Sequence, residues 1–394
     1  MSGENHTLRA ITTDSLRRVI RDIVLEELRR SRGRSFVAQE AYSKEDWDLS
    51  HRGLGLDSLE RFAVAARINE FFALHRSGLE DNLLRAQTLA DVVAVVDAGL
   101  EVSAEEVVFS SGGTVAAPRQ YPHSSTALFQ EAQELATHFS GTERVIVTIP
   151  VHHIYGFIFG VLIPHVLGVS VVDARWSLLA GDNRPGSRDV VVAVPFLWEK
   201  FARTHHLWGA GYRGVTSTAP IPDVVARTIS AGPASLLLEV YGSSETSGIG
   251  WRDHCREGEA GFELFPWWEP VADGAVLQRS PRGEILSIPD NVTWLAPRRL
   301  IPQGRRDTVV QVGGHNVDLS ALRNRILELL PVDDCALRLD EYGRISAYMV
   351  ASEQTDPAAM EQQLADILPD HELPRRISWG IEIPRDELGK LRSW

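Results

Sequence analysis

The chain has 394 residues with 53 acidic and 40 basic side chains, and its formal net charge at pH 7 is −13. That charge argues against a general nucleic-acid-binding protein, because binding a phosphate backbone needs a concentrated basic face. The length allows two or three domains. The two cysteines, Cys255 and Cys335, indicate no disulfide framework, and polar N-terminal residues indicate no signal peptide, so we expect a cytoplasmic protein.

Helices are predicted in the first hundred residues. One is expected from about residue 13 to 30, where apolar residues recur on one face. A second begins after Asp57, and a third runs from Thr88, with a capping-box partner three residues on, to Gly99. Short helices of this kind predict a small helical bundle.

The motif GLDSL, residues 55–59, places a serine at the start of the second helix. It resembles the motif of acyl and peptidyl carrier proteins, in which the matching serine, here Ser58, carries a 4′-phosphopantetheine arm. The resemblance implies a carrier-like four-helix domain over residues 1–101, with a phosphopantetheinyl transferase as a partner. A plain N-cap serine is the simpler interpretation of these residues. We favour the carrier interpretation because the helix pattern extends over the whole segment.

A short buried strand is predicted at 106–110, and the run SSGGTVAAPR follows it. Backbone N–H groups and hydroxyls of such a turn can bind anionic oxygen, and a cation adds charge. The run resembles the phosphate-binding loop of the adenylate-forming superfamily, which includes acyl- and aryl-CoA ligases and peptide-synthetase adenylation domains. It departs from that loop at Val115 and Arg119, where glycine and lysine are usual. The implied ATP-binding residues are Ser110, Ser111, Gly112, Gly113, Thr114 and Arg119.

The apolar stretch from Tyr155 to Val172 is interrupted by Pro164, so it predicts a buried helix, a turn and a strand rather than a membrane span. The segment PVHHIYGF at its start resembles the superfamily segment beside the carboxylate substrate. The matching His153 is a candidate catalytic residue, and the implied substrate pocket is lined by His153, Tyr155 and Phe157. A histidine with a purely structural role is the alternative interpretation.

Two later motifs resemble the nucleotide site of the same superfamily, in the same order along the chain. TSTAPIP supplies Ala219 and Pro220, in a turn that passes the nucleotide. VYGSSETSG follows an apolar strand and is the most specific motif of the set. Its tyrosine would stack on adenine, its second serine would meet phosphate, and its glutamate would bind the Mg²⁺, an ion that prefers oxygen ligands. The matching residues are Tyr241, Gly242, Ser244 and Glu245.

The C-terminal part resembles the hinge and lid of the superfamily. Asp290 would bind the ribose hydroxyls, Arg305 would contact the nucleotide, and Asp307 would be the hinge. In the terminal segment IPRDELGKLR, Lys390 matches the catalytic lysine that reaches the α-phosphate and the carboxylate. The alternative interpretations are a surface turn at Asp290 and a solvated charge at Lys390.

These motifs predict a multidomain protein: the carrier-like helical bundle, a truncated α/β adenylation domain over residues 102–306 and a small α+β lid over 307–394. The implied reaction activates a carboxylic acid with ATP and Mg²⁺ as an acyl-adenylate and loads the acyl group onto the arm of Ser58. A downstream synthase or acyltransferase would take the product. No aspartate accompanies His153 to hold an amino group, so an aromatic or other non-amino acid is expected, as in pigment pathways of secondary metabolism.

Three points stay open. The short connection between carrier and loop implies a homodimer in which each carrier serves the neighbouring subunit. An acyl-CoA ligase that uses free CoA is the first rival interpretation. A non-catalytic carrier or scaffold is the second, supported by the altered residues Val115 and Arg119.

Overall fold

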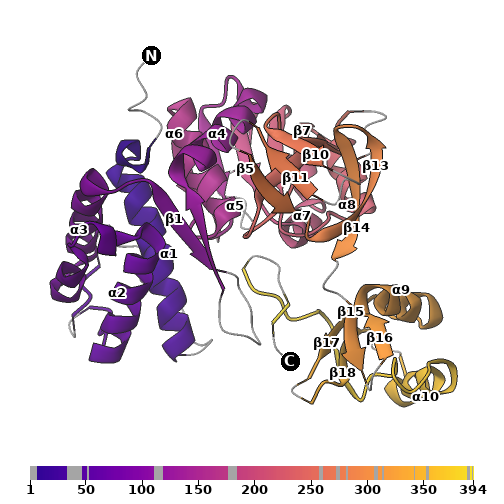
Figure 1. The fold of residues 1–394 in the computed structure, drawn as a ribbon. Coiled ribbons are helices and arrows are strands. Elements are labelled where there is room, and N and C mark those ends of the chain that lie inside the picture. The colour runs from indigo at the N-terminus through magenta and orange to yellow at the C-terminus, as the bar shows by residue number, and fades with distance from the viewer. Residues whose placement is uncertain are drawn as a thin grey trace. The chain divides into compact units, whose positions relative to one another are not determined.

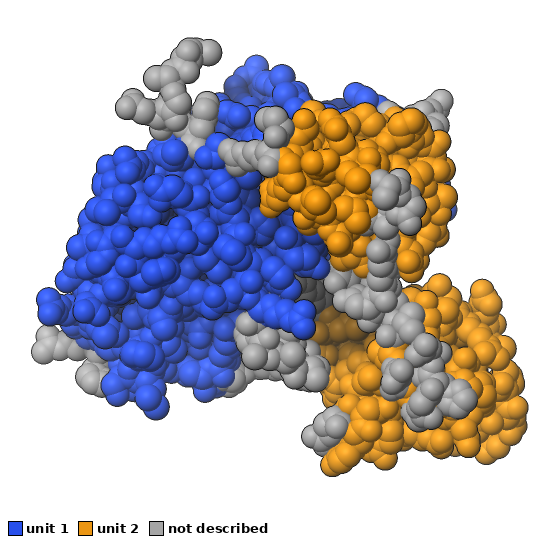
Figure 2. All heavy atoms as spheres, in the orientation of Figure 1, with its two compact units in different colours: residues 1–259 blue, residues 260–394 orange. Residues whose placement is uncertain are grey.

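The structure is a computed structural model with two compact units, residues 1–259 and residues 260–394 (Figure 2), and each unit is described by itself. The structure describes residues 7–32, 47–50, 53–110, 119–175, 184–256, 261–271, 276–280, 283–305, 309–312, 315–340, 342–351, 355–387, 391, 392 and 394. The predicted domain limits after residues 101 and 306 differ from the division between the units, and the three-domain arrangement stays a prediction.

Helices form the N-terminal part of the first unit, as the sequence pattern predicted (Figure 1). They are α1 (Thr13–Arg32), α2 (Ser58–Phe72) and α3 (Leu89–Val102), with the 3₁₀ turns η2 (Leu8–Ala10), η4 (Leu74–Arg76) and η5 (Glu80–Arg85). Both predicted caps are confirmed, because Asp57 and Thr88 each form a capping box with the residue three positions on. Helix α3 extends three residues beyond the predicted end at Gly99.

The N-terminal helices share an apolar core with the rest of the unit. Strands β1 (Glu106–Ser110) and β2 (Gln120–Ser124) pair as an antiparallel hairpin. Between ring centroids, Phe71 of α2 lies 5.4 Å from Phe109 of β1 and 5.8 Å from Phe157. All three rings are buried, and burying such a side chain stabilises a fold by about 1.5–3 kcal/mol.

A sheet with the strand order β8-β7-β6-β5-β3-β4 forms the centre of the first unit. Its strands are β3 (Arg144–Val147), β4 (Ser170–Asp173), β5 (Asp189–Val192), β6 (Tyr212–Thr216), β7 (Ala234–Ser243) and β8 (Ser247–Asp253). Neighbouring strands from β4 to β7 are parallel, and β8 is antiparallel to β7. The sequence DVVV of β5 is buried at every position, as expected for a parallel strand with both faces covered.

Helices and turns accompany this sheet (Figure 1). They are α4 (Ser125–Ala136), η6 (Thr137–Phe139), α5 (Ile154–Phe157), the π-helical turn η7 (Ile158–Leu162), α6 (Ile163–Leu167), α7 (Pro195–Phe201), η8 (His205–Leu207) and α8 (Asp223–Ser230). The helix, turn and strand predicted from Tyr155 to Val172 are confirmed, with Gly168 at a φ of 67° in the turn before β4. Within the part of the chain that the structure describes, no helix combines the length and apolar character that crossing a membrane requires.

The second unit combines antiparallel strands with a small α+β part. Its first strands are β9 (Phe262–Leu264), β10 (Trp268–Val271), β11 (Val276–Arg279), β12 (Glu284–Ser287), β13 (Asp290–Ala296) and β14 (Arg299–Arg305). Its later elements are β15 (Val309–Val312), β16 (His315–Asp318), α9 (Leu319–Leu329), β17 (Asp334–Leu339), β18 (Ile345–Val350), α10 (Pro357–Ile367) and β19 (Arg376–Gly380). Ile326 of α9 and Leu364 of α10 pack into one core with Met349 of β18.

Candidate functional site

The segments that follow the parallel strands form one rim of the first unit, which we call the carboxyl edge: residues 148–153 after β3, 193–194 after β5, 217–220 after β6 and 241–245 at the end of β7. Parallel strands end on the same side of a sheet, and open α/β sheets bind ligands there. The predicted residues on this edge are His153, Ala219, Pro220, Tyr241, Gly242, Ser244 and Glu245. The topology therefore brings together three motifs that are widely separated in sequence.

The turn at the end of β7 is held in one shape by its own residues. Thr246 Oγ1 accepts a hydrogen bond of 3.0 Å from the Ser243 N–H, and Ser247 adopts a φ of 57°. A Cβ atom on Gly242 would lie 2.2 Å from the Ser247 carbonyl oxygen, so only glycine fits there. Glu245 lies half-buried in this turn, where a preformed loop presents its carboxylate at low entropic cost.

Glu131 of α4 supports the same turn, and the sequence analysis missed it. Its buried carboxylate accepts hydrogen bonds from Ser247 Oγ at 2.6 Å and from the Gly248 N–H at 3.0 Å. A hydrogen bond to a charged group contributes about 1.5–3 kcal/mol. Glu131 and Ser247 lie 116 residues apart, and nothing local in the helix distinguishes this glutamate from a surface one.

The β1–β2 hairpin is tied to the turn by a histidine. His123 Nε2 lies 2.7 Å from the Ser244 carbonyl oxygen, so this nitrogen carries the proton and donates it. Ser110 pairs with Gln120 at the end of the hairpin, and Arg119 is exposed. The other predicted residues of the phosphate loop lie outside the described residues: Ser111, Gly112, Gly113 and Thr114.

The turn after β6 is strained. Thr218 has a φ of 80°, a left-handed conformation that costs a β-branched residue about 1–3 kcal/mol. The adjacent Ser217 donates its hydroxyl to the Val240 carbonyl at 2.8 Å, which ties the turn to β7. Ala219 and Pro220 follow and are exposed. Strain of this kind concentrates at ligand sites, which agrees with the position predicted for the nucleotide.

A buried carboxylate fixes the far end of that turn. Glu239 of β7 accepts a hydrogen bond from the Ile221 N–H at 3.1 Å, and its other oxygen lies 2.7 Å from both Arg252 and His254. Burial alone would raise the pKa of Glu239, but the hydrogen bond from His254 and the charge of Arg252 outweigh burial and hold the pKa below its usual value. The carboxylate is therefore ionised and satisfied.

The motif after β3 divides between the core and the carboxyl edge. The Tyr155 hydroxyl lies 3.0 Å from the carbonyl oxygens of Ala193 and Val215 and donates to them, and burial raises its pKa well above the usual value. Phe157 belongs to the buried aromatic cluster. His153 is half-buried. The described contacts of the tyrosine and phenylalanine are internal, and their place in a substrate pocket stays a prediction.

Helix α1 contacts the carboxyl edge through buried charges that the sequence analysis missed. Asp22 is 3% exposed, accepts a hydrogen bond from the Val151 N–H at 2.7 Å and pairs with Arg175 at 2.8 Å. Arg21 pairs with Asp173, at the end of β4, at 2.9 Å. The first of these contacts joins residues 129 positions apart. Helix α1 is therefore an integral part of this edge.

In the second unit, two predicted nucleotide residues are neighbours. Asp290 begins β13 and is buried, and its backbone partner in the antiparallel ladder is Arg305, at the end of β14. The ladder therefore brings the predicted ribose and nucleotide contacts side by side. Asp307 and Lys390 lie outside the described residues.

Ser58 lies where a modifying enzyme can reach it. It is the first residue of α2 and is exposed, and its neighbour Leu59 is 80% exposed. Phe62, one turn further along, is 64% exposed. Accessibility is necessary for a carrier serine, and it is equally compatible with a plain helix start.

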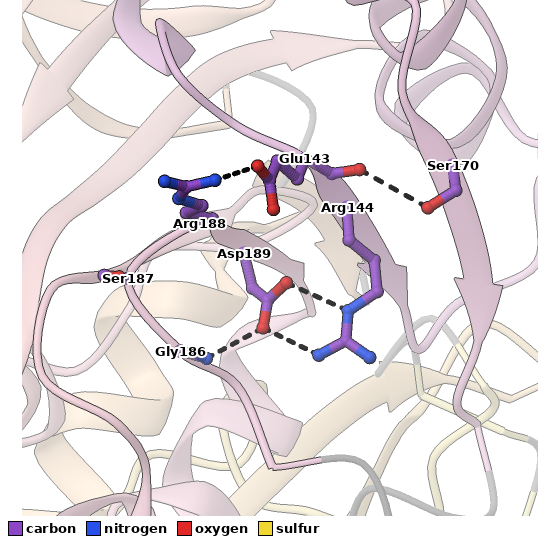
Figure 3. A pocket seen from close by; sticks show the side chains of 7 residues that line it. All are labelled: Glu143, Arg144, Ser170, Gly186, Ser187, Arg188 and Asp189. Carbon is purple, nitrogen blue, oxygen red and sulfur yellow. Dashed lines mark hydrogen bonds and ion pairs between the residues drawn. The ribbon is translucent and has the colours of Figure 1, made fainter.

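A polar hollow of about 590 Å³ lies at the opposite edge of the sheet (Figure 3). Arg144, Ser170 and Asp189 line it and begin β3, β4 and β5, so it is at the amino ends of these strands. Asp189 accepts hydrogen bonds from Arg144 at 2.9 and 2.7 Å, and Arg188 pairs with Glu143. Since these charges pair with one another, the hollow is not the predicted nucleotide site.

A parallel sheet whose motif residues gather at its carboxyl edge is typical of α/β proteins that bind a ligand at that edge. The family model described as AMP-binding enzyme matches residues 100–278. A 4-coumarate–CoA ligase of Halorhodospira halophila is 32% identical over 397 residues, which cover 98% of this chain and 100% of the relative. A second 4-coumarate–CoA ligase, from Cereibacter sphaeroides, is 34% identical and covers 89% of this chain and 86% of the relative.

A solved structure agrees on the fold. The ATP-bound MatB from Rhodopseudomonas palustris matches with a TM-score of 0.54 at 16% identity, over 78% of this chain and 71% of that chain. The chain belongs to the AMP-binding, adenylate-forming superfamily, and its general activity is that of an AMP-forming ligase of acids and thiols.

Proposed function

We propose that the chain activates an aromatic carboxylic acid with ATP and transfers the acyl group to coenzyme A. The observation that carries this proposal is the similarity to the ligase of Halorhodospira halophila along the whole chain, including the N-terminal helices. The segment around His153 also lacks an aspartate that would hold an amino group, which favours an acid without one.

The reaction has two balanced steps. A carboxylate oxygen attacks the α-phosphorus of ATP, which forms the acyl-adenylate and releases pyrophosphate. The CoA sulfur then attacks the activated carbonyl carbon, AMP leaves, and the thiol proton passes to solvent. Charge grows on oxygen in both steps, so the protein must place donors and cations around these oxygens.

The proposed roles follow the motif positions. Glu245 offers the oxygen ligand that suits Mg²⁺, the ion would supply charge that stabilises the phosphate oxygens, and Ser244 would contact the phosphate itself. Lys390 would reach the α-phosphate and carboxylate, and Asp307 would be the hinge. The remaining proposed contacts are the phosphate loop with Ser110 and Arg119 for phosphate, Ala219, Pro220, Tyr241, Asp290 and Arg305 for the nucleoside, and His153, Tyr155 and Phe157 for the acid.

Free CoA is the better-supported acceptor. A carrier must move between the site that loads it and the site that unloads it. Helix α1, however, is attached to the carboxyl edge by the buried contacts of Asp22 with Val151 and Arg175. Moving α1 away from this edge would break the ion pair and take from the Val151 N–H its acceptor, so the attachment favours a helical region that stays in place.

Loading of an arm on Ser58 is the second candidate. The exposed serine at the start of α2, with Leu59 and Phe62 exposed beside it, supports it because a transferase would need such a surface. Only this candidate requires 4′-phosphopantetheine, a phosphopantetheinyl transferase, a downstream synthase or acyltransferase, and a homodimer with exchanged carriers.

Pyrophosphate exchange into ATP tests acid activation directly. We expect exchange with 4-coumarate, cinnamate or benzoate derivatives and none with phenylalanine or tyrosine. Glu245→Gln should lower the exchange rate by about 10²-fold, because charge stabilisation of the phosphate oxygens is lost. Glu199→Gln, which changes an exposed carboxylate on α7 in the same way, should leave the exchange rate unchanged. Absence of exchange with every aromatic acid would overturn the proposal.

Mass spectrometry separates the two acceptors. The reaction mixture contains ATP, free CoA and an acid that supports pyrophosphate exchange. The proposal predicts that protein without a phosphopantetheine arm forms acyl-CoA in this mixture. The second candidate predicts a phosphopantetheine mass increment on the intact chain after incubation with a transferase, and then an acyl increment with ATP. An acyl increment on the chain without acyl-CoA formation would favour the second candidate.

A further inference from the structure

A buried histidine joins helix α1 to the proposed acid site. Glu26 of α1 and His152, in the turn after β3, form an ion pair in which Oε2 lies 2.7 Å from Nε2. The His152 side chain is 3% exposed. Its ring lies against the ring of His153, with 4.1 Å between the centroids and 40° between the planes. A single imidazole ring therefore separates a carboxylate of the helical region from the histidine proposed to contact the acid.

Two neighbours hold the Glu26 carboxylate in one orientation. Arg30, one helical turn further along α1, pairs with Oε1 at 2.6 Å, and His152 meets Oε2. Burial alone would raise the pKa of Glu26, but the charge of His152 and the hydrogen bond with it outweigh burial and hold the pKa below its usual value. The carboxylate is therefore ionised, and each of its oxygens has a partner.

Glu26 restrains the His152 ring from one side. Nδ1 of His152 is buried and has no hydrogen-bond partner among the described residues, so the contact of Nε2 with Glu26 is the polar contact that restrains the ring in this part of the chain. Without the carboxylate, two buried nitrogens would lack a partner there, which favours reorientation of the ring. Because His153 packs on this ring, its own orientation would also be less restricted.

The backbone fixes the register between the helix and the turn. Asp22 lies one helical turn before Glu26, on the same face of α1, and accepts a hydrogen bond of 2.7 Å from the Val151 N–H, next to His152. The pair of Asp22 with Arg175 holds this contact from the segment after β4. The Glu26 carboxylate is therefore held opposite His152 before any substrate binds.

We propose that Glu26 is a positioning residue of the acid site: it fixes His152 and, through that ring, the orientation of His153 toward the carboxylate of the substrate. The inference rests on the proposed function, since it takes His153 as a contact of the acid. It gives the N-terminal helical region a role in the ligase reaction that requires no arm on Ser58. Since Glu26 acts through His152, its removal affects binding of the acid and not binding of the nucleotide.

Pyrophosphate exchange by Glu26→Gln tests this role. Arg30 and His152 both donate to the carboxylate, whereas a carboxamide offers only one oxygen, so one of the two contacts is lost. We expect the KM for the acid to rise about tenfold and the KM for ATP to stay within about twofold. Glu27→Gln is the matched control, because Glu27 pairs with the same Arg30 at 2.8 Å, and it should change neither KM.

A double-mutant cycle shows whether Glu26 acts through His152. His152→Asn should itself raise the KM for the acid, and adding Glu26→Gln should raise it no further. A merely structural role would instead change the KM values for acid and ATP alike. That result, an unchanged acid KM in folded Glu26→Gln, or additive effects of the two substitutions would each overturn the proposal.

NMR of the histidine ring nitrogens in the unaltered chain covers the case in which a variant fails to fold. Binding of the acid should shift the signals of His152 and His153 together, because their rings are in contact, and leave the signal of His206, exposed in η8, unchanged. Binding that shifts His153 without His152 would overturn the positioning role.

Failure of this role is distinct from failure of the ligase proposal. If the unaltered chain exchanges pyrophosphate and Glu26→Gln behaves like Glu27→Gln, only the positioning role is refuted. Absence of exchange by the unaltered chain with every aromatic acid would overturn the ligase proposal and this role with it.

Discussion

Helix α1 and the first turn of α2 belong to one helical region, and each departs from the rule that apolar side chains are buried and charged ones exposed. Helix α1 buries the charged Asp22 against the sheet, whereas α2 begins with Leu59 at 80% and Phe62 at 64% exposure. Buried charges and exposed apolar side chains are the informative departures in a fold. The first indicates a permanent contact inside the unit, and the second indicates a surface without a partner in the described chain.

The largest expected effect comes from breaking the α1 contact. Asp22→Ala should lower the free energy of unfolding by about 3 kcal/mol, because Arg175 loses one of its carboxylates and the Val151 N–H loses its acceptor. Asp14→Ala is the matched control on the same helix, since the Asp14 side chain is 77% exposed and its loss should cost only about 0.5 kcal/mol. Denaturant unfolding measures both. Equal effects would mean that α1 is not held by this contact.

A smaller effect is expected at the ion pair that joins the two helices. Arg32, at the end of α1, donates to both oxygens of Glu60 at 2.7 and 2.6 Å, and this hydrogen bonding lowers the pKa of Glu60 to about 2. The folded pKa is below the ordinary value of 4.5, so the pair stabilises the fold above pH 4.5 and loses its effect as the pH falls toward 2.

Glu60→Gln should therefore cost about 1 kcal/mol at pH 7, after allowance for solvent screening. The difference from the unaltered chain should shrink when unfolding is measured between pH 4.5 and the lowest pH at which both proteins fold. Glu101→Gln, at an exposed position, is the control. A difference that stays constant with pH would contradict the role of this ion pair.

The smallest effect is expected at the exposed start of α2. Replacing Leu59 and Phe62 together by serine should change the free energy of unfolding by less than about 0.5 kcal/mol, because neither side chain is buried on folding. Acyl-CoA formation should also be unchanged. Loss of acyl-CoA formation in a stably folded double variant would show that this surface takes part in the reaction.

The sequence predicted features that depend on neighbouring residues, but it did not predict the contacts between distant parts of the chain. Caps at Asp57 and Thr88 depend on residues three positions apart, and the interrupted apolar run before β4 depends on its own proline and glycines. The partners of Asp22 and Glu131 lie 129 and 116 residues away. Helical periodicity marks which face is apolar, but it does not indicate that one carboxylate on that face will bind a backbone N–H of a distant turn.

The motifs show the same limit at the candidate site. Each of His153, Ala219 and Glu245 belongs to a motif that follows a predicted strand, so the sequence placed all three at strand ends. Because the strands are parallel, these ends lie on one edge of the sheet. The sequence did not identify His123, whose contact with the Ser244 carbonyl joins the hairpin to the turn, because a single histidine in a short strand carries no spacing signal.

Thioester formation by the Ser58→Ala chain tests the central claim most directly, namely that the N-terminal helices are a fixed part of a ligase that loads free CoA. The measurement is the rate of acyl-CoA formation from ATP, CoA and an aromatic acid that supports pyrophosphate exchange. This rate is compared between the variant and the unaltered chain. We predict equal rates, because free CoA is the proposed acceptor and Ser58 is an exposed residue at the start of α2. A variant that still activates the acid but forms no thioester would contradict the account.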